Sequence, residues 1–150
     1  MAYWLLKTEP ETFSYDDLER LGKDRWNGVR NFVALKNLQQ MKRGDLAFIY
    51  HSGKEKAIVG VAEIISEPYP DPDQNDSRLT VVDVAPRYRL IRPISLKRIK
   101  TDIKFKDWEL ISQPRLSVVP VKEEYWKLIQ ESSMPELVRV LQRFNANGWK

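Results

Sequence analysis

The sequence predicts an α+β fold in which about five or six β-strands form a small barrel with helices around it. The first observation is the order of segments, namely a strand, two helices, several strands, a short helix, a strand and two helices. This order lacks the strict alternation of a doubly wound parallel sheet. The second is that the strands differ in character, since 57–65 is almost wholly apolar whereas 79–84 alternates. Because so small a barrel encloses no channel, a ligand pocket is expected at its mouth or beside it.

The first third of the chain predicts one strand and two capped helices. Tyr3–Lys7 is aromatic and β-prone, as strands are. Ser14 is placed to cap a helix that Gly22 ends, and Asn31 to cap a second helix after a loop at 23–30. The apolar faces of these two helices are expected to be Leu18 and Leu21 in the first, and Phe32, Leu35, Leu38 and Met41 in the second.

The middle of the chain predicts three strands. Gly60, inside the most apolar of them, indicates a strand buried on both faces or one closely approached by other backbone. Three prolines at alternate positions in Glu67–Asp73 predict an irregular loop, because proline removes hydrogen-bond donors and excludes helix. The expected strands are Leu46–Tyr50, Ala57–Ile65 and Leu79–Val84, the last continuing through Tyr88–Ile91 after a bulge or edge at Pro86.

The last third predicts a short basic helix, a final strand and two further helices. Trp4, Trp108 and Trp126 each lie in an apolar run and are expected in the core. We expect residues 1–150 to form a single domain. The predicted elements are a helix capped by Ser95 through Lys100, a connector at Ile103–Trp108, a strand at Leu116–Val119 stopped by Pro120, a helix at Lys122–Gln130, and a last helix capped by Ser133 and Glu136 before Leu137 and Val138.

The composition excludes several kinds of chemistry. The 150 residues contain no cysteine and one histidine, His51, which excludes disulfides and thiolate catalysis and argues against a histidine-based zinc site. The apolar run at the start is too short for a signal peptide or a membrane span. We therefore expect a cytoplasmic protein without a metal, a cofactor or a membrane partner.

Positive charge gathers in the second half of the chain. The net charge of +4 divides into −3 for residues 1–86 and +7 for residues 87–150. This density fits a surface that faces nucleic-acid phosphates, although a solvated face would have the same composition. The candidate phosphate-binding residues in this segment are Arg87, Arg89, Arg92, Lys97, Arg98 and Lys100.

The stretch Trp26–Asn31 combines an indole, two amides, a guanidinium and a glycine within six residues. Such a set could stack on a flat ring, hydrogen-bond to its edges and let backbone approach closely. The alternative is structural, with Trp26 in the core, Gly28 in a turn and Asn31 as a helix cap.

Seven short blocks occur in a fixed order along nearly the whole chain, namely Tyr3–Pro10, Ser14–Leu18, Trp26–Asn31, Gly44–Leu46, Tyr50–Ser52, Tyr69–Asp71 and Arg115–Val118. In these blocks the sequence resembles the EVE domain of the PUA-like superfamily. The resemblance implies a PUA-like pseudobarrel and a pocket for a flipped modified base, above all a modified cytosine in DNA. RNA is the other candidate, since PUA-like relatives more widely bind RNA.

The resemblance also implies which side chains surround the base. Trp26 is the expected stacking residue, and Asn27 departs from the Asp that relatives often carry there. Arg30 is expected either to clamp a phosphate or to pair with an acid such as Asp45, and His51 to be a hydrogen-bonded structural imidazole. The implied base-pocket residues are Lys7, Thr8, Glu9, Trp26, Asn31, Tyr50, His51, Ser52 and Ser117.

Two functions follow from these residues. The first is a non-catalytic module that binds nucleic acid carrying a modified base. The second is an amidohydrolase acting on a modified pyrimidine nucleoside, because the related ASCH domains use a lysine, a threonine and a glutamate, and this chain has Lys7, Thr8 and Glu9 in sequence. Adjacent strand residues point to opposite faces, so the second function requires a bend at this point. We expect the binding module.

Overall fold

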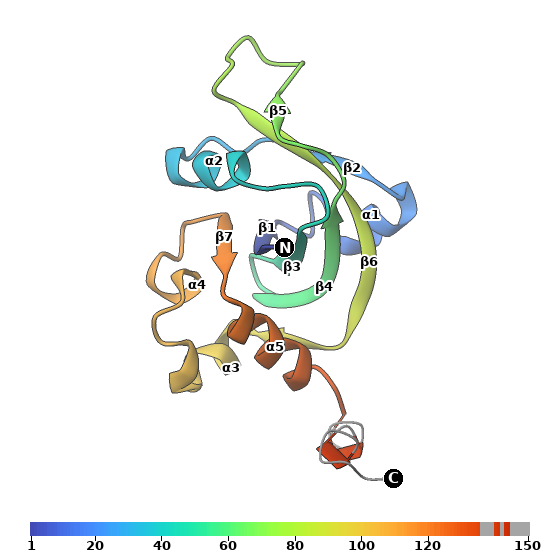
Figure 1. Cartoon of the computed structure of the whole chain (residues 1–150), viewed down its shortest axis with the longest axis vertical. Helices are drawn as coiled ribbons and strands as arrows, with labels where there is room; N and C mark the ends of the chain where they lie inside the picture. The colour runs from blue at the N-terminus through green and yellow to red at the C-terminus, as the bar shows by residue number, and fades with distance from the viewer. Residues whose placement is uncertain (136–139, 142, 145–150) are drawn as a thin grey trace.

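A computed structural model describes residues 1–135, 140, 141, 143 and 144 of the chain. Its core is one curled, mixed sheet of seven strands, one more than the upper expectation (Figure 1). Six strands follow the order β2-β6-β4-β3-β1-β7, and β5 pairs with β6. The strands are β1 (Tyr3–Thr8), β2 (Asp24–Trp26), β3 (Leu46–His51), β4 (Ala57–Ile64), β5 (Tyr69–Pro70), β6 (Thr80–Ser95) and β7 (Val118–Val121).

The helices lie around this sheet, and side-chain caps fix where three of them begin (Figure 1). Ser14, Asn31 and Ser95 each accept a hydrogen bond from a backbone N–H of the first turn, as predicted. Gly22 ends the first helix in the left-handed conformation, also as predicted. The helices are α1 (Tyr15–Leu21), α2 (Phe32–Gln39), α3 (Leu96–Thr101), the 3-10 turn η1 (Ile103–Phe105), α4 (Glu109–Ser112) and α5 (Glu123–Ser132).

The position of β1 determines which residues meet at the site. This strand runs parallel to β3 and antiparallel to β7, so its end, Thr8, lies beside His51. Lys7 donates its backbone N–H to the carbonyl of Ser117 at 3.0 Å. The end of β1 and the segment before β7 are therefore neighbours although more than a hundred residues separate them in the sequence.

Four local expectations were wrong. The segment 23–30 is not all loop, because 24–26 pairs with β6 as β2. The proline-rich segment contains β5, whose two residues pair with β6. The last strand continues through Pro120, which is tolerated because β7 is an edge strand. Leu21 and Phe32 are exposed rather than part of the apolar helix faces.

The C-terminal helix expected after Ser133 largely falls outside the described residues. Glu136, Leu137 and Val138 are among the residues that the structure does not describe, as is Trp149. Ser133 itself follows α5 and donates its hydroxyl to the carbonyl of Gln130 at 2.8 Å. Ser133 is therefore the residue that caps the end of α5.

The predicted aromatic core is confirmed. Trp4, Trp108 and Trp126 are all buried, and the Trp126 ring stacks between Tyr3 and Phe48 at centroid distances of 4.4 and 4.0 Å. Strand β4 is buried at almost every position, as its composition predicted. The pairing of β4 with β6 shifts register opposite Pro86, which confirms the expected bulge.

Tyr15 joins α1 to the sheet through a fully buried hydroxyl. Its ring has no exposed surface and its hydroxyl donates to the carbonyl of Val61 at 2.8 Å. Burial, followed by the negative charge of Glu19, raises the pKa of the Tyr15 hydroxyl from 10.0 to about 12. The un-ionised phenol therefore stabilises the fold fully below the pKa of the unfolded chain, and this contribution is lost as the pH rises through the folded pKa.

This shift gives a prediction for alkaline pH. Between pH 10.0 and about pH 12, the free energy of unfolding should fall by about 2 kcal/mol more in the wild type than in Tyr15→Phe, which has no proton to lose. Urea denaturation at stepped pH measures both proteins, and other tyrosines and lysines cancel in the difference. Parallel pH profiles would show that the buried hydroxyl is not responsible.

Candidate nucleic-acid interface

The loop after β2 borders a cavity of about 510 Å³ beside the sheet. Strand β2 supplies Trp26, and Asn31 ends the loop by accepting the N–H of Ala34 at 3.0 Å as the cap of α2. Gly28 has a φ of 81°, which favours glycine, and a Cβ there would meet no heavy atom within 4 Å. The cavity is lined by Lys7, Thr8, Thr12, Phe13, Asp24, Arg25, Trp26, Asn27, Gly28, Val29, Arg30 and Ser117.

Four of the nine predicted pocket residues share this cavity. They are Lys7, Thr8, Trp26 and Ser117, and they come from the end of β1, from β2 and from the segment before β7. Their contact with a base remains a prediction. Five predicted residues do not line the cavity, namely Glu9, Asn31, Tyr50, His51 and Ser52.

Trp26 is mostly buried, with 7% of its surface exposed. Phe13 packs against its ring edge-to-face, with 6.2 Å between the centroids, and also lines the cavity. Phe13 was not among the predicted pocket residues, because it follows Pro10 in an irregular segment without periodicity. The two alternatives for Trp26 were a residue that stacks on a base and a residue of the core. The indole packs in the core and still borders the cavity, so each alternative describes part of its environment.

Lys7 and Thr8 line the cavity from the end of β1. The ammonium group of Lys7 donates to the carbonyl of Pro114 at 2.9 Å and lies 5.5 Å from the ring centroid of Tyr50. Burial lowers the pKa of Lys7 from its usual value. The hydroxyl of Thr8 donates to the carbonyl of Phe13 at 2.7 Å, which holds the next segment over the end of β1.

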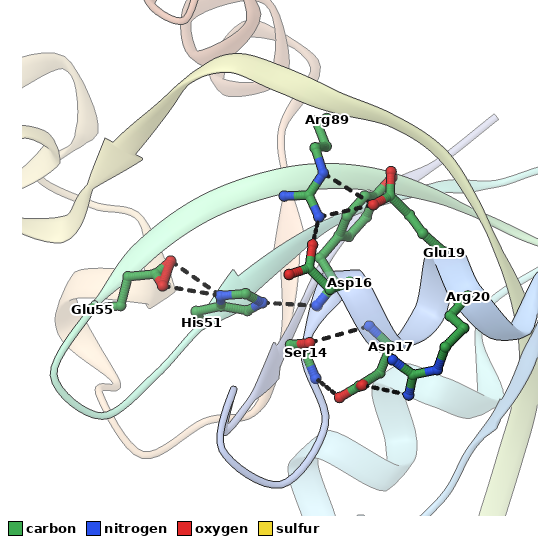
Figure 2. A network of polar contacts seen from close by, with 9 residues as sticks. Ser14, Asp16, Asp17, Glu19, Arg20, His51, Glu55 and Arg89 are labelled. Atoms are coloured by element: carbon green, nitrogen blue, oxygen red, sulfur yellow. Dashed lines mark hydrogen bonds and ion pairs between the residues drawn. The ribbon is translucent and has the colours of Figure 1, made fainter.

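His51 serves the fold, as expected from the sequence, and it does not line the cavity, so its contact with a base stays a prediction (Figure 2). Its Nε2 accepts the backbone N–H of Tyr15 at 3.0 Å, so Nδ1 carries the proton in the neutral ring. Nδ1 lies 3.0 Å from the carboxylate of Glu55. Both ring nitrogens are therefore occupied, and the imidazole joins the end of β3 to the start of α1.

Glu9, Ser52, Tyr50 and Asn31 also have structural partners. The Ser52 hydroxyl lies 3.2 Å from the Glu9 carboxylate, and Tyr50 is buried beneath Lys7. The carbonyl oxygen of Asn31 is used as the helix cap. The lysine, threonine and glutamate needed for an amidohydrolase are thus not gathered in one cavity, because Glu9 is directed to Ser52.

A second concavity, of about 460 Å³, adjoins the first along Asp24, Arg25 and Asn27. Arg25 forms an ion pair with Asp73 at 2.8 Å, which ties the proline-rich segment to β2. Tyr69 donates to Asp83 at 2.6 Å, which ties the same segment to β6. Hydrogen bonding to Tyr69 raises the pKa of Arg25 above its usual value. This network fixes one side of the loop that carries Trp26.

Acids from elsewhere in the chain pair with two of the predicted phosphate-binding arginines of β6, whose role at a phosphate stays a prediction. Arg87 pairs with Glu63, and Arg89 pairs with Asp16 and, at 2.8 Å, with Glu19 (Figure 2). Arg92 donates to the carbonyl of Met134. By contrast, the side chains of Lys97, Arg98 and Lys100 form no ion pair in the part of the chain that the structure describes.

Asp45 is not the acid that pairs with Arg30, because the buried Asp45 carboxylate accepts hydrogen bonds from the indole of Trp4 and from the backbone N–H groups of Ala2 and Lys42. Arg30 instead interacts electrostatically with Asp76, where hydrogen bonds from Arg78 and, added to them, the charge of Arg30 lower the pKa of the carboxyl. Arg30 also lines the cavity next to Trp26. Its guanidinium forms no ion pair with the described residues, so a role at a phosphate stays a prediction.

The described residues form neither a metal site nor a membrane span. No group of three or more histidine, cysteine, aspartate or glutamate side chains in the described ranges could hold a metal ion. None of the described helices has both the length and the apolar character needed to cross a bilayer.

The α+β fold with its curled sheet and the cavity at the end of β1 define a PUA-like domain. A family model described as "EVE domain" matches residues 2–132, and the chain belongs to this family. Among curated proteins, mouse thymocyte nuclear protein 1 is 34% identical over 85% of this chain and 71% of its own. An uncharacterised protein of Schizosaccharomyces pombe is also 34% identical, over 93% of this chain and 72% of its own.

Solved structures show the same fold. A Rhodopseudomonas palustris protein is 42% identical, with a TM-score of 0.83 over 87% of this chain and 92% of its own. Human THYN1 protein, solved in complex with DNA containing 5-methylcytosine, is 29% identical, with a TM-score of 0.84 over 91% of this chain and 99% of its own. An ASCH protein from Zymomonas mobilis is 12% identical, with a TM-score of 0.52 over 84% of this chain and 92% of its own, and shares the fold alone.

Proposed function

We propose that this protein is a non-catalytic module that binds DNA carrying a modified cytosine and takes the modified base into the cavity beside Trp26. The observation that carries the proposal is the relation to human THYN1 protein in complex with DNA containing 5-methylcytosine, which aligns with nearly the whole domain. A cavity of about 510 Å³ lies at the end of β1 in this chain, and it is large enough for one flipped base.

The residues that line the cavity fit this task. Trp26 and Phe13 offer aromatic surface for a base that has left the stack, which is worth about 1–3 kcal/mol per base. The ammonium group of Lys7 and the hydroxyl of Ser117 can donate hydrogen bonds to the O2 and N3 acceptors of a cytosine. Arg30 can hold a neighbouring phosphate. In this proposal the residues act by binding alone, and no step breaks a covalent bond.

Residues 1–150 act as one domain in this proposal. The proposed compartment is the cytoplasm, as expected from the sequence. The lack of cysteine fits the reducing cytoplasm, whereas the name of thymocyte nuclear protein 1 refers to the nucleus.

Fluorescence anisotropy with a panel of labelled oligonucleotides tests the proposal. The panel comprises single-stranded and duplex DNA and the matching RNA, each with one cytosine, 5-methylcytosine or 5-hydroxymethylcytosine, at two salt concentrations. We expect salt-dependent binding that is several-fold tighter for a modified DNA than for its unmodified counterpart. Equal affinities across the panel would overturn the proposal, and tighter binding of the RNA set would replace DNA with RNA. A separate incubation of the protein with an acylated cytidine tests for catalysis. Free cytidine detected by chromatography would show that the protein is an enzyme instead.

A further inference from the structure

The start of α2 presents large apolar side chains to solvent right after the Trp26 loop. Phe32 is 70% exposed and Val33 is 45% exposed, whereas Leu35 and Leu38 on the same helix are buried. An exposed phenyl ring contributes little to folding, and exposed apolar groups that gather at one place mark binding surfaces. The exposure of Phe32 therefore points to a role outside the core.

Phe32 borders a groove of about 360 Å³ between α2 and the segment that leads into β6. Its apolar lining consists of Phe32, Leu35 and Leu79. Gln39 also lines the groove and donates its side-chain amide to Thr80 at 3.0 Å, which joins α2 to the start of β6. The groove is thus held by contacts that already exist without a ligand.

The rim of this groove carries more positive than negative charge. Its one acid, Asp76, forms an ion pair with Arg78 at 2.9 Å. Arg30 and Lys36 form no ion pair in the ranges that the structure describes, although Arg30 interacts electrostatically with Asp76, and the Lys36 ammonium lies 5.1 Å from the Phe32 ring centroid. A partly apolar lining whose charged groups are mostly positive suits a base with its phosphates better than an acidic or purely apolar partner.

Arg30 lines both the groove and the cavity beside Trp26, so the two concavities are neighbours. A nucleic-acid strand whose modified base enters the cavity would pass Arg30 and meet Phe32 next. We propose that the groove binds the base adjacent to the modified one, with this base stacked on Phe32 and the intervening phosphate on Arg30. This inference rests on the function proposed above and adds a second base site to it.

The experiment uses duplex DNA with a single 5-methylcytosine and a neighbouring 2-aminopurine, whose fluorescence responds to stacking. Phe32→Ala should lower the affinity roughly tenfold and remove most of the fluorescence change on binding. It should leave the affinity ratio between 5-methylcytosine and cytosine unchanged, because the groove does not contact the modification. Phe32→Tyr should retain wild-type binding, and Phe32→Leu should not, since only an aromatic ring stacks on a base.

Ile91→Ala is the matched control, because Ile91 is 63% exposed and lines neither the groove nor the cavity. Both alanine variants should melt within a few degrees of the wild type. Wild-type affinity in Phe32→Ala, while the preference for 5-methylcytosine persists, would overturn the second base site alone. A wild type without that preference would overturn the proposed function. If Phe32→Ala abolished capture of a protein partner and left DNA binding intact, the groove would be a protein-docking surface and this inference would be wrong.

Discussion

Replacing Trp26 with alanine is expected to remove the preference for modified cytosine and to lower the free energy of unfolding by about 3–5 kcal/mol. The two effects have one cause, since the indole is 93% buried against neighbours such as Phe13 and also borders the cavity. Loss of base stacking alone should cost about 1–3 kcal/mol, or about 5- to 150-fold in affinity. Thermal unfolding measures the loss of stability, and anisotropy titration of paired modified and unmodified duplexes measures the loss of preference.

A matched pair of variants separates stacking from stability. Trp26→Phe keeps an aromatic ring at the cavity and should lose less of both quantities than Trp26→Ala. Trp108→Phe removes the same atoms from a fully buried indole that does not line the cavity, so it should lower stability and leave the preference unchanged. If Trp26→Ala and Trp26→Phe, studied at a temperature where both are folded, keep the wild-type preference, then Trp26 is a core residue and does not stack on the base.

Helix boundaries could be predicted because their signals are local. Ser14, Asn31 and Ser95 each lie three residues before the backbone N–H that they cap, so the sequence contains the whole interaction. Strand β2 could not be predicted in this way, since it has three residues and exists through its pairing with 82–84. The exposure of Phe32 was missed for a related reason. Helical periodicity groups it with Leu35, but at the first helical position its side chain is exposed whereas that of Leu35 is buried.

The site was predictable only where the family resemblance linked distant segments. No local signal places Ser117 next to Lys7, because the backbone hydrogen bond between them depends on the pairing of β1 with β7. Proximity in sequence does not show where a side chain is directed. His51 is the last residue of β3 and lies beside Thr8, yet its ring is directed to α1 and Glu55. Charge density along the chain likewise could not show that Glu19 lies within reach of Arg89.

Replacing Gly60 with any larger residue is expected to destabilise the protein. A Cβ at this position would lie 2.6 Å from a ring carbon of Tyr15, which is closer than any packed pair of carbon atoms. The sequence predicted a close approach by backbone, and the structure shows an aromatic side chain in that place. Neither group can move cheaply, because Gly60 is inside the buried strand β4 and the Tyr15 ring is fully buried with its hydroxyl on Val61.

Gly60→Ala should therefore lower the free energy of unfolding by about 1–3 kcal/mol, as overpacked cores do. Tyr15→Leu, which removes the ring, provides the test of the cause. In that background Gly60→Ala should cost close to nothing, so the double-mutant cycle should give a coupling energy of about the size of the single Gly60→Ala effect. Urea denaturation of the four proteins measures the cycle. Additive effects would mean that the cost of Gly60→Ala comes from the backbone of β4, and that α1 is not held against the sheet by this contact.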